Sequence, residues 1–126
     1  MTVDARAFKT AWFAKAAKRA KIGDAELGEA IKQVLLGQAD DLGGGVYKKR
    51  LSNNQYRSIV LARGGDFWVY EHLFAKQDLA NIDNSDLSDL RKIAKSYAAL
   101  TKADADAQIE SGRWIEIGLQ PTEPRQ

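Results

Sequence analysis

Basic side chains that could bind a phosphate are concentrated between residues 42 and 65. This stretch has five basic residues and no acidic one: Lys48, Lys49, Arg50, Arg57 and Arg63. Lysine and arginine donate charge-assisted hydrogen bonds to phosphate oxygens. We therefore expect a phosphate site here. The alternative is that these cations only solubilise a short sheet or protect its edge.

Other catalytic groups are few. The chain has no cysteine and a single histidine, His72, which excludes disulfides, thiol catalysis and Cys-based zinc sites. His72 could serve as a general base only with an orienting acid and a nucleophile nearby, so a structural role is the simpler interpretation. Serine-elbow, H-E-x-x-H and Walker motifs are absent. We expect the carboxylate pairs 40–41 and 104–106 at helix ends, in capping and solvation.

Three segments rich in β-branched and aromatic residues must position the basic side chains. They span residues 46–51, 56–63 and 67–74, and they predict a strand meander. The turns are expected at 52–55 and at Gly64-Gly65, because glycines adopt positive φ freely. Alternation places Lys48 and Arg50 on one face of the first strand and Lys49 on the other.

Aromatic side chains of the third segment have two interpretations. Trp68, Tyr70 and Phe74 alternate along a predicted central strand, which is typical of core residues. The alternative is that they stack on RNA bases. The glycine triplet 43–45, just before the first strand, is expected to be flexible.

Helical periodicity flanks the strands on both sides. Residues 10–21 place Trp12, Ala16 and Ala20 on one face with Phe13 and Ala17 beside it, and residues 24–35 follow as a second helix capped by Asp24, with a stop at Gly37. This pair predicts a helical hairpin that covers one side of the sheet. A third helix begins at a cap at Asn84 or Ser85, and its apolar stripe comprises Leu87, Leu90, Ile93, Ala94, Tyr97 and Leu100. Thr101 and Asp104 have capping-box spacing for a fourth helix, which Gly112 ends, and residues 114–117 predict a short strand.

Length and composition indicate one domain. The chain has 126 residues, 44% hydrophobic and 29% charged, so we expect a single domain over 1–119 and a disordered tail over 120–126. Its net charge of +2 is too small by itself to indicate a nucleic-acid ligand. Basic residues interrupt the apolar ones near the N-terminus, and no stretch approaches membrane-spanning length. These features predict a cytoplasmic protein.

Four motifs occur in a specific order: F-K-T-x-W-F at 8–13, D-L-G-G-G-V-x-K-K-R at 41–50, Y-R-S-I-x-L at 56–61, and F-A-K at 74–76 followed by N-I at 81–82. In this combination the chain resembles the RelE/HigB group of toxins from bacterial type II toxin-antitoxin modules, over about residues 6–100. The resemblance implies an α+β fold in which an N-terminal helical hairpin packs on a small, mainly antiparallel twisted sheet, followed by C-terminal helices. Residues 101–119 would form an extension of unknown role.

The resemblance also implies an activity: metal-independent and cofactor-free cleavage of mRNA in the ribosomal A site, by attack of a ribose 2′-hydroxyl on the adjacent phosphate. The family's catalytic positions fall on Lys48, Lys49, Arg57 and Lys76, and phosphate-binding roles fall on Arg50 and Arg63. Arg57 would stabilise the transition state, and Lys48 and Lys49 would transfer protons or hold the substrate. Some members have an arginine and a tyrosine where this chain has Gln77 and Asp83, so the general acid is left open.

The implied partner is a cognate antitoxin, often of helix-turn-helix type, through which the pair would bind its operator DNA. Two other functions fit the sequence. One is a non-catalytic, ParE-like toxin that inhibits DNA gyrase; the other is a basic RNA-binding domain without toxicity. Retention of Lys48, Lys49, Arg50 and Arg57 favours the nuclease, whereas the acidic third helix mildly favours the gyrase inhibitor.

Overall fold

A computed structural model describes residues 6–53, 55–63, 67–77, 84–97 and 99–118. Along the chain, the elements are β1 (Arg6–Thr10), α1 (Ala11–Arg19), α2 (Asp24–Leu35), β2 (Asp40–Gly43), β3 (Val46–Leu51), β4 (Tyr56–Arg63), β5 (Phe67–Ala75), α3 (Asn84–Tyr97), α4 (Lys102–Glu110) and β6 (Trp114–Ile117). The expected α+β class, the N-terminal helices on the sheet and the two helices after it are confirmed. In the described residues, no helix is long and apolar enough to cross a membrane.

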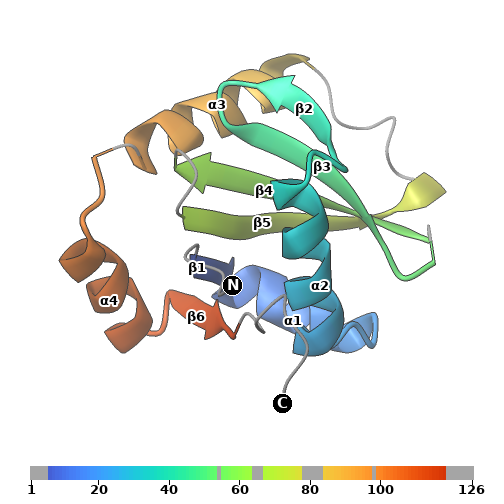
Figure 1. The fold of residues 1–126 in the computed structure, drawn as a ribbon, viewed down its shortest axis with the longest axis horizontal. Helices are drawn as coiled ribbons and strands as arrows, with labels where there is room; N and C mark the ends of the chain where they lie inside the picture. Colours follow the sequence, from blue (N-terminus) through green and yellow to red (C-terminus); the bar gives the residue numbers. More distant parts are fainter. Residues whose placement is uncertain (1–5, 54, 64–66, 78–83, 98, 119–126) are drawn as a thin grey trace.

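A single six-stranded sheet organises the molecule, in the order β2-β3-β4-β5-β1-β6 (Figure 1). The β3-β4-β5 meander is confirmed. β1 and β2 were not expected from the sequence. β1 lies parallel to β5, and every other neighbouring pair is antiparallel, so the sheet is mixed.

Helix α1 continues the line of β1 and packs beside β5. Thr10 caps it, because its Oγ1 accepts a hydrogen bond from the Phe13 amide at 3.1 Å. The buried face is centred on Phe13 and Ala17, whereas Trp12 is 49% exposed. The expectation that Trp12 lies on the main apolar face is therefore wrong: it lies at the margin of that face.

Helix α2 begins at Asp24, and Gly23 occupies the N-cap position without a side-chain cap. The predicted capping role of Asp24 is therefore wrong. Its carboxylate instead accepts a hydrogen bond from the Lys9 ammonium. Gly37 follows the helix with φ of 83°, a conformation that ends helices readily because glycine has no Cβ.

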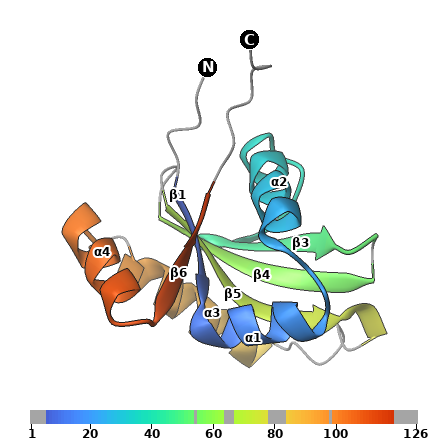
Figure 2. The same ribbon diagram turned by 90° about the horizontal axis from the view of Figure 1, so that it is seen from below.

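The two faces of the sheet are covered by different helices, α2 on one side and α3 on the other (Figure 2). On the α2 face, the Tyr70 hydroxyl donates a 2.8 Å hydrogen bond to the Leu27 carbonyl. On the α3 face, Ala94 packs with Val46, Ile59 and Leu61. Ile93, expected in the apolar stripe of this helix, is exposed, because the stripe that meets the sheet is narrower than the sequence pattern suggested.

A bulge in β5 changes the direction of its later side chains. The β4–β5 register shifts between Ile59 and Val60, opposite Glu71. Trp68 and Tyr70 belong to the core on the α2 side, as expected of core aromatics. Phe74 packs on the α3 side instead, so it does not share a face with them.

The connections before and after β3 are tight turns. Gly43 ends β2, and Gly44 and Gly45 join it to β3; all three have positive φ, so the glycine triplet forms a tight turn. The 52–55 turn is confirmed by a 3.1 Å bond from the Gln55 amide to the Ser52 carbonyl. Asp40 and Asp41 lie in β2, so their predicted place at a helix end is wrong. Gly64-Gly65 lies outside the described residues.

Residues beyond Leu100 complete the sheet. The Thr101–Asp104 capping box and the 114–117 strand are confirmed. β6 pairs with β1, and the Arg6 guanidinium bonds the Glu116 carboxylate at 2.9 Å. Asp104 is a capping residue, but Asp106 forms an ion pair with Arg6 at 3.0 Å. The predicted tail at 120–126 lies outside the described residues.

Candidate functional site

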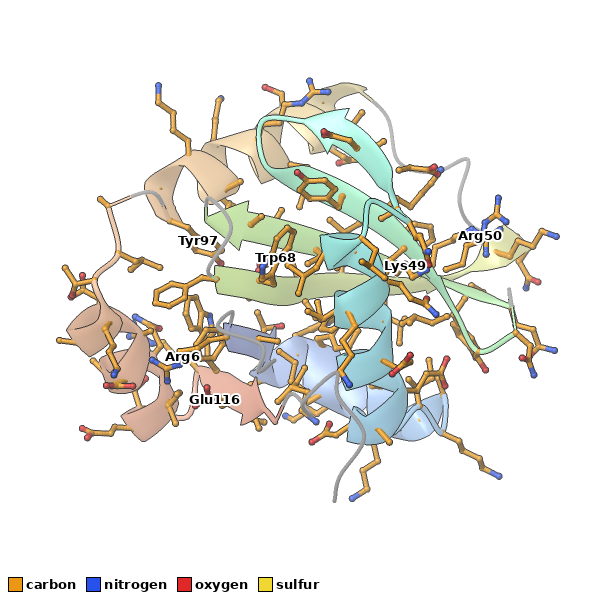
Figure 3. The ribbon with its side chains drawn as sticks, in the orientation of Figure 1. Arg6, Lys49, Arg50, Trp68, Tyr97 and Glu116 are labelled. Carbon is orange, nitrogen blue, oxygen red and sulfur yellow. The ribbon has the colours of Figure 1, made fainter. Side chains whose placement is uncertain are left out.

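One end of the sheet carries the cations. Arg50 at the end of β3 pairs with Arg57 at the start of β4, which in turn pairs with Phe74 near the end of β5. The Lys76 amide donates a 2.9 Å hydrogen bond to the Gln55 carbonyl at the same end. Figure 3 shows Arg50 at the end of the sheet where β5 ends. Arg63 lies at the opposite end of β4, and its side chain is outside the described part of the chain.

Three of the cations predicted from the sequence line a single hollow, which we call the edge pocket. Its volume is about 310 Å³, and it is lined by Lys48, Lys49 and Arg50 together with residues 37–40. It forms because the pairing of β2 with β3 reaches no further than the Asp40–Lys48 pair, which leaves the outer edge of β3 open beyond that point. Lys48 and Lys49 point to opposite faces of β3, and both reach the pocket because this strand edge is open.

The two adjacent lysines have different surroundings. The Lys48 ammonium lies 3.5 Å from the Asp40 carboxylate, with which it forms an ion pair. The Lys49 ammonium donates a 3.1 Å hydrogen bond to the Gln38 carbonyl. Burial lowers the pKa of Lys49, and the neighbouring Arg50 charge lowers that pKa further. Lys49 is thus better suited than an ordinary lysine to exchange a proton near neutrality.

Arg57 lies beneath the surface, with 5% of its area exposed. Its Nη1 donates a 3.2 Å hydrogen bond to the Tyr56 carbonyl. Because directly opposed residues on neighbouring strands share a face, its side chain lies on the same side of the sheet as Arg50. Arg57 is thus next to Arg50 but covered, so direct contact with a phosphate requires the groups that cover it to move.

Lys76 is exposed and lines a separate hollow of about 460 Å³ with Asn53, Gln55, Tyr56, Ala75 and Gln77. The structure thus gathers Lys48, Lys49 and Arg50 in one pocket and places Arg57 in register with Arg50. Lys76 lies at the same end of the sheet but outside this pocket.

Sequence reasoning missed two features of this end. The first is the Asp40–Lys48 pair, which could not be foreseen because β2 was not predicted. The second is a set of three rings, Trp12, His72 and Phe74, which we call the aromatic row: Trp12 stacks on His72 and His72 contacts Phe74. The sequence feature that could have indicated the aromatic row is the position of Trp12 at the margin of an apolar stripe centred on Phe13. Burial lowers the pKa of His72, while Asp86 acts in the opposite direction.

Chemically, this end of the sheet can bind phosphate and transfer protons through lysine. In the described residues, no group of three or more His, Cys, Asp or Glu side chains could hold a metal ion. The fold and the site thus define an α+β domain with a cationic pocket at the edge of its sheet.

The chain belongs to the RelE toxin family. The family model described as the RelE toxin of the RelE/RelB toxin-antitoxin system matches residues 5–117, which confirms the resemblance found in the sequence motifs. The match extends past residue 100 and includes α4 and β6. Comparisons with curated proteins and with solved structures gave no match.

Proposed function

We propose that this toxin is an endoribonuclease that cleaves mRNA in the ribosomal A site. The observation that carries the proposal is the edge pocket, in which Lys48, Lys49 and Arg50 converge on one hollow beside the buried Arg57. Retention of these cations supports a phosphodiester substrate over the non-catalytic, gyrase-inhibiting alternative.

The reaction we propose needs no group beyond the RNA and these side chains. The ribose 2′-oxygen forms a bond to the adjacent phosphorus, and the bond from phosphorus to the 5′-oxygen breaks. The products are a 2′,3′-cyclic phosphate and a 5′-hydroxyl. One proton leaves the 2′-hydroxyl and one reaches the departing 5′-oxygen, so the step requires a base, an acid and cations that stabilise the phosphoryl charge.

The roles follow from the surroundings of each side chain. Burial lowers the pKa of Lys49, so we assign Lys49 the role of the base that accepts the 2′-hydroxyl proton. Lys48 and Arg50 bind the non-bridging oxygens, and the planar Arg50 guanidinium can contact two of them. Some relatives have an arginine and a tyrosine where this chain has Gln77 and Asp83, and neither of these two residues can protonate the leaving oxygen. Lys76 is exposed at this end of the sheet and carries a transferable proton. We therefore assign the protonation of the leaving oxygen to Lys76.

The partner we propose is a RelB-type antitoxin that covers the edge pocket. Acidic side chains of the antitoxin would complement the cations of the edge pocket. An antitoxin bound in this way would keep mRNA out of the pocket. Binding of operator DNA by the pair would occur through a helix-turn-helix domain of the antitoxin.

The proposal is tested by brief induction in a bacterial host followed by mapping of mRNA 5′ ends. We expect new 5′-hydroxyl ends in register with codons for the wild type, and their loss in Arg50→Ala. Arg19→Ala removes the same charge from an exposed position at the end of α1 and should cleave normally. Arg57→Ala is less informative because this residue is buried. Growth arrest with intact mRNA would support the gyrase-inhibiting alternative, and neither effect would indicate a binding domain without toxicity.

A further inference from the structure

We propose that the aromatic row is a platform on which an unpaired base of the RNA stacks, one nucleotide or so away from the phosphate in the edge pocket. This inference rests on the proposed RNA substrate and adds to it the part of the protein that contacts a base. It assigns Trp12 the contact with the base, and His72 and Phe74 the support behind it.

The rings are arranged as a stack. The Trp12 indole and the His72 imidazole are nearly parallel, with centroids 4.7 Å apart and an interplanar angle of 5°. His72 and Phe74 lie 5.9 Å apart at 38°. Trp12 is fixed in the first turn of α1 by the neighbouring Phe13, which is fully buried. A base stacked on the indole would therefore extend a column of rings that the fold already holds in place.

Exposure at this position is unusual for tryptophan. Trp12 is 49% exposed, whereas Trp68 and Trp114 are 5% and 6% exposed. Covering a large exposed aromatic surface is favourable in free energy, because it removes apolar area from water. Flat aromatic rings are also the surfaces on which single-stranded RNA bases stack.

The pairing of the strands places the row beside the cations. His72 pairs with Ile59 on β4, which pairs with Lys48 on β3. Phe74, Arg57 and Arg50 form the neighbouring row across the same three strands. Directly paired residues share a face, so the rings of His72 and Phe74 lie on the same side of the sheet as Lys48, Arg50 and Arg57. Lys49 lies on the opposite face and lines the edge pocket from there. With strands about 4.8 Å apart, Lys48 lies roughly 10 Å from His72.

The aromatic row and the edge pocket differ in their charged neighbours. Asp86, in the first turn of α3, acts electrostatically on His72, so a carboxylate lies near the platform. The edge pocket, by contrast, has three cations and one carboxylate. A ligand with a neutral flat ring at one point and an anion a short distance away matches both, and a nucleotide in single-stranded RNA has this pattern.

The test uses a labelled hexanucleotide with 2′-O-methyl groups, which binds but cannot be cleaved, and the same oligomer with abasic positions. Wild-type protein should bind the first more tightly, with quenching of Trp12 fluorescence. Trp12→Ala should weaken binding of the base-containing oligomer by roughly 5- to 150-fold and leave the abasic one unchanged. Trp12→Phe should restore most of the loss. Leu36→Ala, at an apolar residue that is 74% exposed and outside the row, is the matched control.

Several results would overturn the platform. They are equal binding of the two oligomers by wild-type protein, no quenching, or unchanged affinity in a Trp12→Ala protein with native circular dichroism. Unchanged RNA affinity with weakened antitoxin binding would assign Trp12 to a protein interface and also overturn it. These results leave cellular mRNA cleavage, which tests the proposed function, unaffected. Conversely, base-dependent binding through Trp12 without any cleavage would uphold the platform and reject the nuclease.

Discussion

At the scale of single residues, the site depends on the different surroundings of two neighbouring lysines. Lys48 is paired with the Asp40 carboxylate, 3.5 Å away. Lys49 bonds only a backbone carbonyl among the contacts described for it, and its pKa is lowered by burial and by Arg50. A substrate-holding role suits the first and a proton-accepting role suits the second, because a base must be able to lose its proton.

This difference predicts the pH dependence of cleavage. A base acts in its neutral form, and a lowered pKa brings that form to lower pH, so the rate should rise with pH before an ordinary lysine would begin to lose its proton. Lys49→Arg should abolish this rise and reduce the rate by about 100-fold or more, because guanidinium stays protonated. Single-turnover cleavage on programmed ribosomes between pH 6 and 9, with Lys48→Arg as control, measures both. An unaltered profile in Lys49→Arg would exclude Lys49 as the base.

At the scale of elements, local patterns predicted what local interactions determine. The meander β3-β4-β5, the four helices and β6 follow from alternation, periodicity and caps. β1 and β2 escaped prediction because both are short and have few pattern residues. β1 is also stabilised by distant partners, the first half of β5 and β6. The bulge at Glu71 had no sequence signal, although it decides that His72 and Phe74 share the face of Arg57.

The candidate site shows the same division. The concentration of cations between residues 42 and 65 was visible in the sequence, and so was the alternation that separates Lys48 from Lys49. Their convergence was not visible, because the edge pocket exists only where the short β2 ends. The burial of Arg57 was not foreseeable either, because it depends on how the chain packs at that end of the sheet.

Since β6 completes the sheet, its anchor should be essential for stability. Trp114 is buried, and its ring centroid lies 5.0 Å from that of Phe8 and 5.4 Å from that of Tyr97. Trp114→Ala should therefore lower the free energy of unfolding by about 3–5 kcal/mol. Ile115→Ala, at the adjacent residue with 40% exposure, should cost no more than about 1 kcal/mol. Urea denaturation of both variants measures the difference. Equal stabilities would show that β6 is a dispensable addition to the domain.

At the scale of the whole molecule, the charge is unevenly distributed. A net charge of +2 gives little general attraction to nucleic acid, so the local concentration of cations at one end of the sheet must supply it. Binding of RNA should therefore depend on salt through few phosphate contacts, and the part of the affinity that comes from base stacking should not depend on salt in this way.

Measuring RNA affinity against salt separates these contributions. Each phosphate contact with a single strand adds about 0.7 to the slope of log affinity against log salt, so the three cations of the edge pocket predict a slope near −2. Arg50→Ala should reduce its magnitude by ~0.7. Trp12→Ala should lower affinity at every salt concentration and leave the slope unchanged, because a stacked base releases no counterion. A slope that changes equally in both variants would mean that Trp12 acts by positioning phosphates, and a steeper slope in the wild type would show that cations outside the edge pocket also bind the RNA.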